Sequence, residues 1–299
     1  MLAQPCFSGY PFLVFVSATK FAHRGLTIAK SIDYEKGEAD CYLTLAIING
    51  WQKNISQSLK YSFDALKIYK NIGDIQGEVA THLNLQGGYR QAGDFNSSLA
   101  HAHEGVQIAE ANNVIGKDIA FPGHRIAPLL LAEIGQTHLL NHQLDSALIY
   151  TQKSIIKNEV FNGASWGFPV YLLATIQTEL GDYENALKNY HLSIELSVKN
   201  GIYRDTLQNF SGMSTLFRKT GDLDSSIYYA QKVNHSWNLT SETKNLIEAV
   251  TNLGQSYKLM GNLDSAVKYI ERSQVLKDSI YSIDKDREVQ NIAINEKMK

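Results

Sequence analysis

One ten-residue pattern recurs through the chain at intervals close to 40 residues, and it limits the possible folds more than any other feature. Its three clearest copies read GDYENALKNY, GDLDSSIYYA and GNLDSAVKYI, and related strings precede them. The intervals between successive copies are 40, 49, 39, 40 and 40 residues, and the six starts are Lys53, Gly93, His142, Gly181, Gly221 and Gly261. Self-similarity at a fixed period indicates an array in which each unit packs against its neighbours.

Each copy predicts a hairpin of two helices. The residue five places after the start is always small: Ser58, Ser98, Ala147, Ala186, Ser226 and Ala266. A small side chain at a fixed position lets two helix axes approach closely, and the aliphatic residue that follows it fills the seam. Before each start lies another apolar stretch with helical spacing, such as Leu246, Val250 and Leu253. The sequence therefore predicts an all-α fold, with a leading helix before each start and a second helix after it.

The string NLGQSYKLMGNLDSAVKYIERS, which begins at Asn252, resembles the tetratricopeptide repeat. The resemblance is carried by Leu253, Gly254, Tyr257, Gly261, Ala266 and Tyr269, the last one place early. No copy has the early Trp or the closing Pro of that family, and the unit is longer than the usual ~34 residues, so we expect longer helices. The resemblance implies a right-handed superhelical solenoid of tetratricopeptide-like hairpins with a period of about 40 residues.

The same frame predicts how the chain is organised. Residues 17–276 form the array, with a half repeat, six hairpins and an insertion near 113–125. Residues 1–16 are expected to be an irregular leader or a truncated first helix, and 277–299 an exposed C-terminal helix. Because the opening half repeat has no clear partner helix, we expect the chain to be a gene fragment. We also expect it to self-associate through the apolar surface that an uncapped array exposes.

Composition narrows the possible partners. The 28 Lys and Arg balance 30 Asp and Glu without a basic block, so nucleic acid is not an expected partner. No apolar run reaches the ~18 residues of a membrane span, and PFLVFV is too short for a signal peptide. Two cysteines without CxxC spacing give no disulfide framework. The compartment stays open: cytoplasmic by default, or periplasmic if the chain is part of a membrane sensor.

The sequence predicts no enzyme, no cofactor and no metal site. It contains no P-loop, HExxH, GxSxG or EF-hand spacing. His101 and His103 lie two apart on one expected helix, so they point roughly 200° apart and cannot share an ion. His82 and the other histidines fall at repeat positions without a matching carboxylate or thiol pattern. A hydrolase or transferase site in the insertion is a less favoured alternative, since a spacer explains that segment more simply.

A peptide-binding surface is the sharper functional hypothesis. Leading helices line the concave side of such an array, where a groove binds an extended peptide or a partner helix. Arg218 and Lys258 occupy the same repeat position, so we expect two cations roughly 10 Å apart that could hold a carboxylate. The alternative is a merely solvated inner face. The candidate residues are Arg90, Gln136, Phe168, Tyr171, Thr175, Gln208, Ser211, Thr215, Arg218, Thr251, Gln255 and Lys258.

A second resemblance concerns the order of the parts. An array that opens with a half repeat and closes in the string KDSIYSIDKDREVQNIAINEK resembles the sensor regions of Bacteroidetes-type histidine kinases and transcriptional regulators. That resemblance implies a non-catalytic module for protein or peptide binding, in a bacterial signal-transduction protein whose output domain is not in this chain. The alternative is a stand-alone tetratricopeptide adaptor or chaperone-like scaffold.

Overall fold

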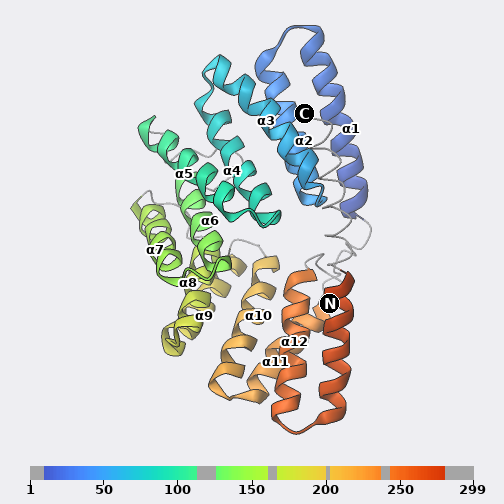
Figure 1. The fold of residues 1–299 in the computed structure, drawn as a ribbon, viewed down its shortest axis with the longest axis vertical. Helices are drawn as coiled ribbons and strands as arrows, with labels where there is room; N and C mark the ends of the chain where they lie inside the picture. Colours follow the sequence, from blue (N-terminus) through green and yellow to red (C-terminus); the bar gives the residue numbers. More distant parts are fainter. Residues whose placement is uncertain (1–9, 113–125, 161–166, 200–202, 237–242, 280–299) are drawn as a thin grey trace. The chain divides into compact units, whose positions relative to one another are not determined.

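The computed structural model describes residues 10–112, 126–160, 167–199, 203–236 and 243–279 (Figure 1). All regular structure in these ranges is α-helix, so the prediction of an all-α repeat fold is confirmed. The helices are α1 (Tyr10–Ser31), α2 (Glu35–Trp51), α3 (Ile55–Ile72), α4 (Ile75–Gln91), α5 (Phe95–Ala111), α6 (Ile126–Leu140), α7 (Leu144–Val160), α8 (Gly167–Leu180), α9 (Tyr183–Lys199), α10 (Tyr203–Thr220), α11 (Leu223–Ser236), α12 (Thr243–Leu259) and a helix over 263–279.

The described helices fall into two compact units. The first contains α1 to α7, and the second begins at Ser165 and contains α8 to α12 together with the helix over 263–279. In the sequence, 17–276 reads as one continuous array. Each unit is treated below by itself.

Helix length explains the 40-residue period. Within the first unit α2, α4 and α5 have 17 residues each and α3 has 18, and turns of two or three residues separate them. Two such helices and their turns make one period, longer than the ~34 residues of a tetratricopeptide repeat. Every described second helix begins two residues after its repeat start, at the apolar residue of the pattern. The predicted register is therefore confirmed.

The small residue of each repeat lies where the two helices of a hairpin pack. All six are at most 2% exposed. Ser58 donates a hydrogen bond from its hydroxyl to the carbonyl of Ala46 on α2, at 2.8 Å. In the second unit, Ser226 of α11 and Ser214 of α10 each donate to the other's carbonyl, at 2.9 Å. These contacts satisfy the buried hydroxyls, which explains why serine is tolerated at this position as well as alanine.

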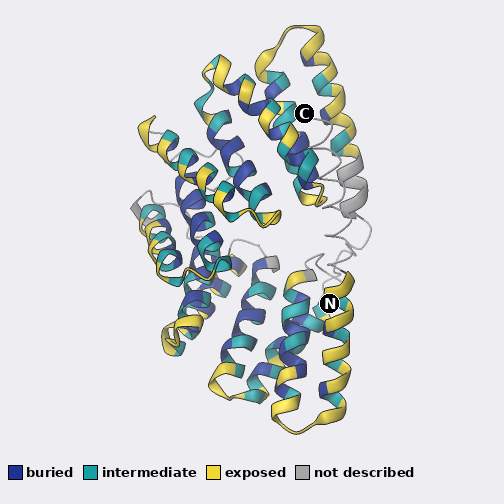
Figure 2. Ribbon diagram, in the orientation of Figure 1, coloured by how far each residue is buried: buried dark blue, intermediate teal, exposed yellow. Residues whose placement is uncertain are grey.

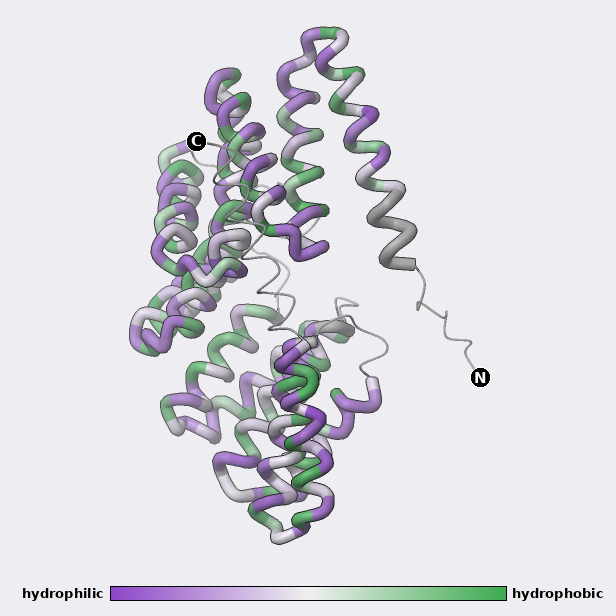
Figure 3. Tube along the Cα trace, turned by 45° about the vertical axis from the view of Figure 1, so that its right-hand side comes forward, coloured by the Kyte–Doolittle hydropathy of each residue, from purple (hydrophilic) through white to green (hydrophobic). Residues whose placement is uncertain are grey.

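Apolar side chains fill the space between neighbouring helices. One cluster in the first unit includes Leu130 and Ile134 of α6, and one in the second unit includes Tyr190 and Met213. Buried positions run along the middle of the helices, whereas most turns are exposed (Figure 2). Hydrophobic and hydrophilic residues alternate along the helices (Figure 3). This is the amphipathic pattern expected of helices that bury one side.

Two boundaries differ from the sequence analysis or lie outside the described residues. Helix α1 begins at Tyr10, so it extends into the segment 1–16 that was expected to be irregular or truncated. Residues 1–9, the insertion 113–125 and the expected C-terminal helix beyond 279 lie outside the described ranges. None of the described helices combines the length and the apolar character that crossing a membrane requires.

Two glycines of α4 provide a matched test of the packing. A Cβ at Gly77 would lie 2.3 Å from the ring of Tyr69, which is 1% exposed, whereas a Cβ at Gly87 meets nothing within 4 Å. We expect Gly77→Ala to destabilise the protein by about 1–3 kcal/mol, because the buried ring must move. We expect Gly87→Ala to stabilise it by about 0.5–1 kcal/mol, through helix propensity. Chemical unfolding measures both, and changes of the same sign would contradict the packing described here.

The six repeat starts all have positive φ, which permits a further test. Four are glycines, whereas Lys53 (φ 64°) and His142 (φ 57°) adopt the same left-handed conformation with a side chain. A non-glycine residue in this region costs about 1–2 kcal/mol. We therefore expect Lys53→Gly to stabilise the protein by about 1 kcal/mol and to raise its melting temperature. Gly93→Ala is the control: with no atom within 4 Å of the new Cβ, any loss of stability comes from the backbone alone. A lower melting temperature for Lys53→Gly would contradict the assigned turn.

Candidate functional site

The predicted binding residues lie on the leading helices, as the repeat register requires. Arg90 is on α4, Gln136 on α6, and the others are on α8, α10 and α12. Leading helices of successive repeats contact one another within each unit: α2 with α4, α4 with α6, α8 with α10, and α10 with α12. Second helices of successive repeats also touch through side chains, as in the ion pairs of Lys70 with Glu104 and of Lys157 with Glu110. The leading helices therefore form a shared face in each unit.

A hydrogen-bonded chain of polar side chains crosses from α10 to α12 in the second unit. Thr215 donates to Oε1 of Glu248, at 2.9 Å. Asn252 donates its amide to Thr215 and accepts from Nε of Arg218, both at 2.9 Å. Thr215 and Arg218 are predicted binding residues, whereas Glu248 and Asn252 of α12 are their partners in the structure. Arg218 thus already has one partner on the neighbouring leading helix.

Two tyrosines extend this face to α8. Tyr190 lies 3.4 Å from the hydroxyls of Thr175 and Thr178, and its ring packs near that of Tyr171. Burial raises the pKa of Tyr190 to about 12. Burial, with the negative charge of Glu248, also raises the pKa of Tyr171 well above its ordinary value, although hydrogen bonds from Thr175 and Gln208 oppose that rise. Both phenols therefore stay protonated at neutral pH.

Not every predicted residue is accessible to a partner. Ser211 is 1% exposed and its hydroxyl has no hydrogen-bond partner among the described residues, so it lies inside the protein instead of on a binding surface. Phe168, Tyr171 and Gln208 are half-buried. In the first unit, Arg90 approaches Glu133 to 2.5 Å and both side chains are more than four-fifths buried. Arg90 is therefore already neutralised, and Gln136 nearby is half-buried.

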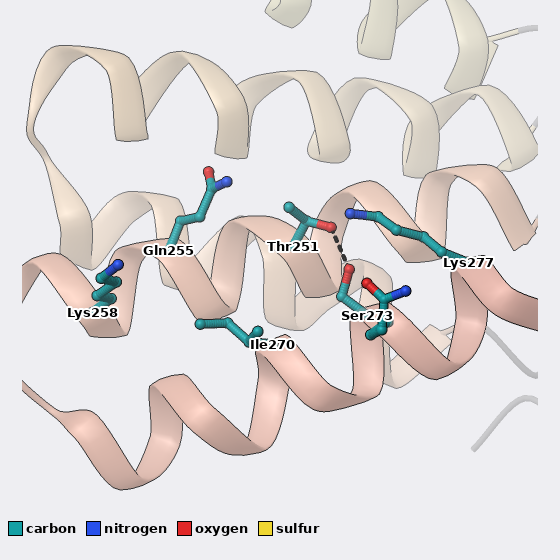
Figure 4. A pocket seen from close by; sticks show the side chains of 7 residues that line it. Thr251, Gln255, Lys258, Ile270, Ser273 and Lys277 are labelled. Carbon is teal, nitrogen blue, oxygen red and sulfur yellow. Dashed lines mark hydrogen bonds between the residues drawn. The ribbon is translucent and has the colours of Figure 1, made fainter.

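Part of the predicted surface lines a pocket of about 270 Å³ between α12 and the helix over 263–279 (Figure 4). Thr251 and Ser273 are joined at its wall by a hydroxyl contact of 2.6 Å. Lys258 and Lys277 line the same pocket. The complete lining is Thr251, Gln255, Lys258, Ile270, Ser273, Gln274 and Lys277. Three predicted residues thus meet here, and the pocket offers two ammonium groups to an anionic ligand.

The structure also brings together three residues that the sequence analysis kept apart. His82 of α4 is 0% exposed, and its Nδ1 lies 3.2 Å from Nδ1 of His101 on α5. Glu104, one turn further along α5, places Oε1 3.6 Å from Nε2 of His82. Burial lowers the pKa of His82 to about 4 and also lowers that of His101, so both rings are neutral at pH 7. His103 points elsewhere, against the ring of Tyr150, as its spacing from His101 predicts.

Hairpin register could have revealed this pair. Counted from the start at Gly93, His82 lies 11 residues before it and His101 lies 8 after it. The small-residue contacts at Ser58 and Ser226 join residues 7 before and 5 after their starts. One helical turn further from the hairpin turn on each helix reaches His82 and His101.

Comparison with known proteins agrees with the fold. The tetratricopeptide repeat family matches residues 170–199 and 247–276, which are the hairpin of α8 and α9 and the last described hairpin. No curated protein matches the chain by sequence. These two segments therefore match the tetratricopeptide repeat, as the sequence predicts.

Solved structures with the same fold include Rap proteins and a signal transduction ATPase. A Rap protein complexed with competence and sporulation factor has 14% identity and a TM-score of 0.67, covering 92% of this chain and 74% of that one. The apo form of RapI has 13% identity and a TM-score of 0.68, covering 92% and 96%. A signal transduction ATPase with a tetratricopeptide repeat sensor from Pyrococcus horikoshii has 14% identity and a TM-score of 0.58, covering 85% and 39%. At such identities the likeness shows the fold alone.

The polar chain between α10 and α12 gives a stability prediction. Asn252 is 3% exposed and bonds two side chains of the neighbouring helix. We expect Asn252→Ala to cost about 1–3 kcal/mol, because it leaves polar groups of Thr215 and Arg218 without their partner. Gln255→Ala, three residues along on an exposed position, should change stability by no more than about 0.5 kcal/mol. Equal losses in thermal unfolding would show that this chain adds nothing to the packing of the two helices.

Proposed function

We propose that this chain is a non-catalytic module that binds a protein or peptide through the leading-helix face of its second unit. The observation that carries the proposal is the pocket beside α12, which is lined by Lys258 and Lys277 as well as by Thr251 and Ser273. Ammonium groups and hydroxyls together bind a carboxylate and the polar backbone of an extended segment. The expected ligand is therefore a peptide with an acidic side chain or a free C-terminus.

The role in signal transduction is the finer part of the proposal. Two of the structures with the same fold are a Rap protein in complex with competence and sporulation factor and an ATPase whose repeats are its sensor. By analogy, we assign this chain the sensory or regulatory part of a bacterial signalling protein. A stand-alone adaptor or chaperone-like scaffold is the alternative. A net charge of −2 without a basic patch favours a protein partner over nucleic acid.

Cation removal tests the binding surface. The full chain is used to select ligands from a displayed library of random linear peptides, and the affinity of the enriched peptides is measured for the Lys258→Ala, Lys277→Ala double variant, which removes both cations of the pocket. We expect acidic peptides to be enriched and their affinity to fall about 30-fold, since a loss of ~2 kcal/mol corresponds to that factor. Circular dichroism and thermal unfolding check that the variant remains folded.

A second double variant separates a local effect from a general loss of charge. Lys188→Ala, Lys268→Ala removes two exposed cations from second helices and changes the net charge by the same amount. Peptide affinity should be unchanged in this variant. If both variants bind equally well, or if no peptide is enriched, the face is only a solvated inner surface and the proposal is wrong.

A further inference from the structure

The histidine pair in the first unit has the geometry of a ligand set as well as of a packing contact. His82 projects from α4, whereas His101 and Glu104 project from the same face of α5, since residues three apart on a helix are neighbours. One ligand atom from each of these three residues lies within 4.8 Å of the other two. The 3.2 Å between the two Nδ1 atoms is close to the ~3.3 Å that separates two nitrogens bound tetrahedrally to one Zn²⁺ at 2.0–2.1 Å.

A second observation is that one nitrogen of the cluster lacks a hydrogen-bond partner in the described part of the chain. Nε2 of His82 is buried and has no hydrogen-bond partner among the described residues. The Glu104 oxygen is the closest acceptor, but at 3.6 Å it is too far for a hydrogen bond. A buried nitrogen without a partner costs free energy that packing alone does not return. An ion that binds Nδ1 of His82 leaves the proton of that ring on Nε2, and a Glu104 carboxylate drawn inward by the ion can accept from Nε2 while its other oxygen binds the ion.

The surroundings leave a route to this cluster. His101 is half-buried between the rings of Phe63 and Tyr89, and the Glu104 side chain is 44% exposed. An ion therefore reaches the two histidines from the Glu104 side, and the exposed carboxylate has the freedom to adjust. His82, fully enclosed, supplies the fixed ligand at the inner end.

We propose that His82, His101 and Glu104 form a binding site for one divalent transition-metal ion of borderline softness, represented by Zn²⁺. Two imidazoles and a carboxylate are a ligand set that suits this ion, and a fourth tetrahedral position is left for water. The site departs from the expectation of no metal drawn from the sequence. The ion would connect α4 to α5 within one hairpin of the first unit, so this proposal does not depend on the proposed peptide-binding face of the second unit.

Lys70 is the charge that opposes the ion. Its ammonium lies 3.3 Å from Glu104 and 3.6 Å from Glu78, so it competes for the carboxylate that the metal needs. Because its side chain is 46% exposed, it can remain with Glu78 when the ion binds. Removing this positive charge is therefore expected to strengthen metal binding, whereas removing any of the three ligands weakens it.

Zinc titration of the full chain, prepared without an added histidine tag, tests the site. Isothermal calorimetry with Zn²⁺ alone should show one ion per chain with micromolar or tighter affinity, and the melting temperature should rise in excess Zn²⁺. His101→Gln and Glu104→Gln should each weaken binding at least tenfold, and thermal unfolding checks that both variants remain folded. Bound Co²⁺ should give the intense visible absorption of a tetrahedral site.

Two further variants make the test specific. His103→Gln removes an imidazole two residues away that faces Tyr150, and it should leave Zn²⁺ affinity unchanged. Lys70→Gln should tighten binding several-fold; unchanged or weaker binding would contradict the placement of the ion beside Glu104. If the wild-type chain binds no Zn²⁺ at about 100 μM, or if His103→Gln lowers affinity as much as His101→Gln, the cluster is a buried polar contact and the proposal is overturned.

Discussion

The close approach of two helices at one small residue is the contact on which each hairpin depends. A larger side chain at Ser98 or Ala186, both 0% exposed, would force the axes apart and expose the aliphatic seam beside them. Glycines show how tight the approach is: a Cβ at Gly135 would lie 3.3 Å from the carbonyl of Ala147, the small residue of the opposite helix. Because every repeat meets the same constraint, a small residue recurs in all six copies while the remaining positions vary.

That freedom is visible along the shared leading-helix faces. Arg90 and Arg218 both lie three residues before a repeat start, and each reaches a residue nine before the next start: Glu133 for one and Asn252 for the other. One repeat position therefore supplies a cation that holds successive leading helices together. Lys258 has the same position in the last described hairpin, where no further leading helix follows among the described residues. The same residue type thus stabilises the array internally and becomes available at the pocket beside α12.

The features that repeat along the chain could be predicted from the sequence, whereas a contact between two particular side chains on different helices could not. The six starts, the buried small residues and the beginnings of the second helices follow from local patterns that repeat, so one chain suffices to find them. The contact of His82 with His101 depends on two helices at once, and spacing along one helix, as for His101 and His103, does not show it. Ser211 was expected on the surface because its position in the repeat was assigned to the concave face. Tyr171 and Thr251 at that position are half-buried, whereas the small serine lets its neighbours close over it.

The two proposed binding sites differ in physical character, and the difference follows from what surrounds them. Around the pocket, Lys258 and Lys277 are exposed, so a ligand there gains little unless it excludes water from the ammonium groups. His82 is already desolvated by folding, so binding an ion there costs no further desolvation of that ring, and the low local dielectric strengthens the bonds to the ion. A peptide surface built this way is expected to bind reversibly and to depend on salt. A buried cluster favours tighter binding that also stabilises the hairpin. The repeat architecture accommodates both kinds of site because each repeat contacts only its neighbouring repeats.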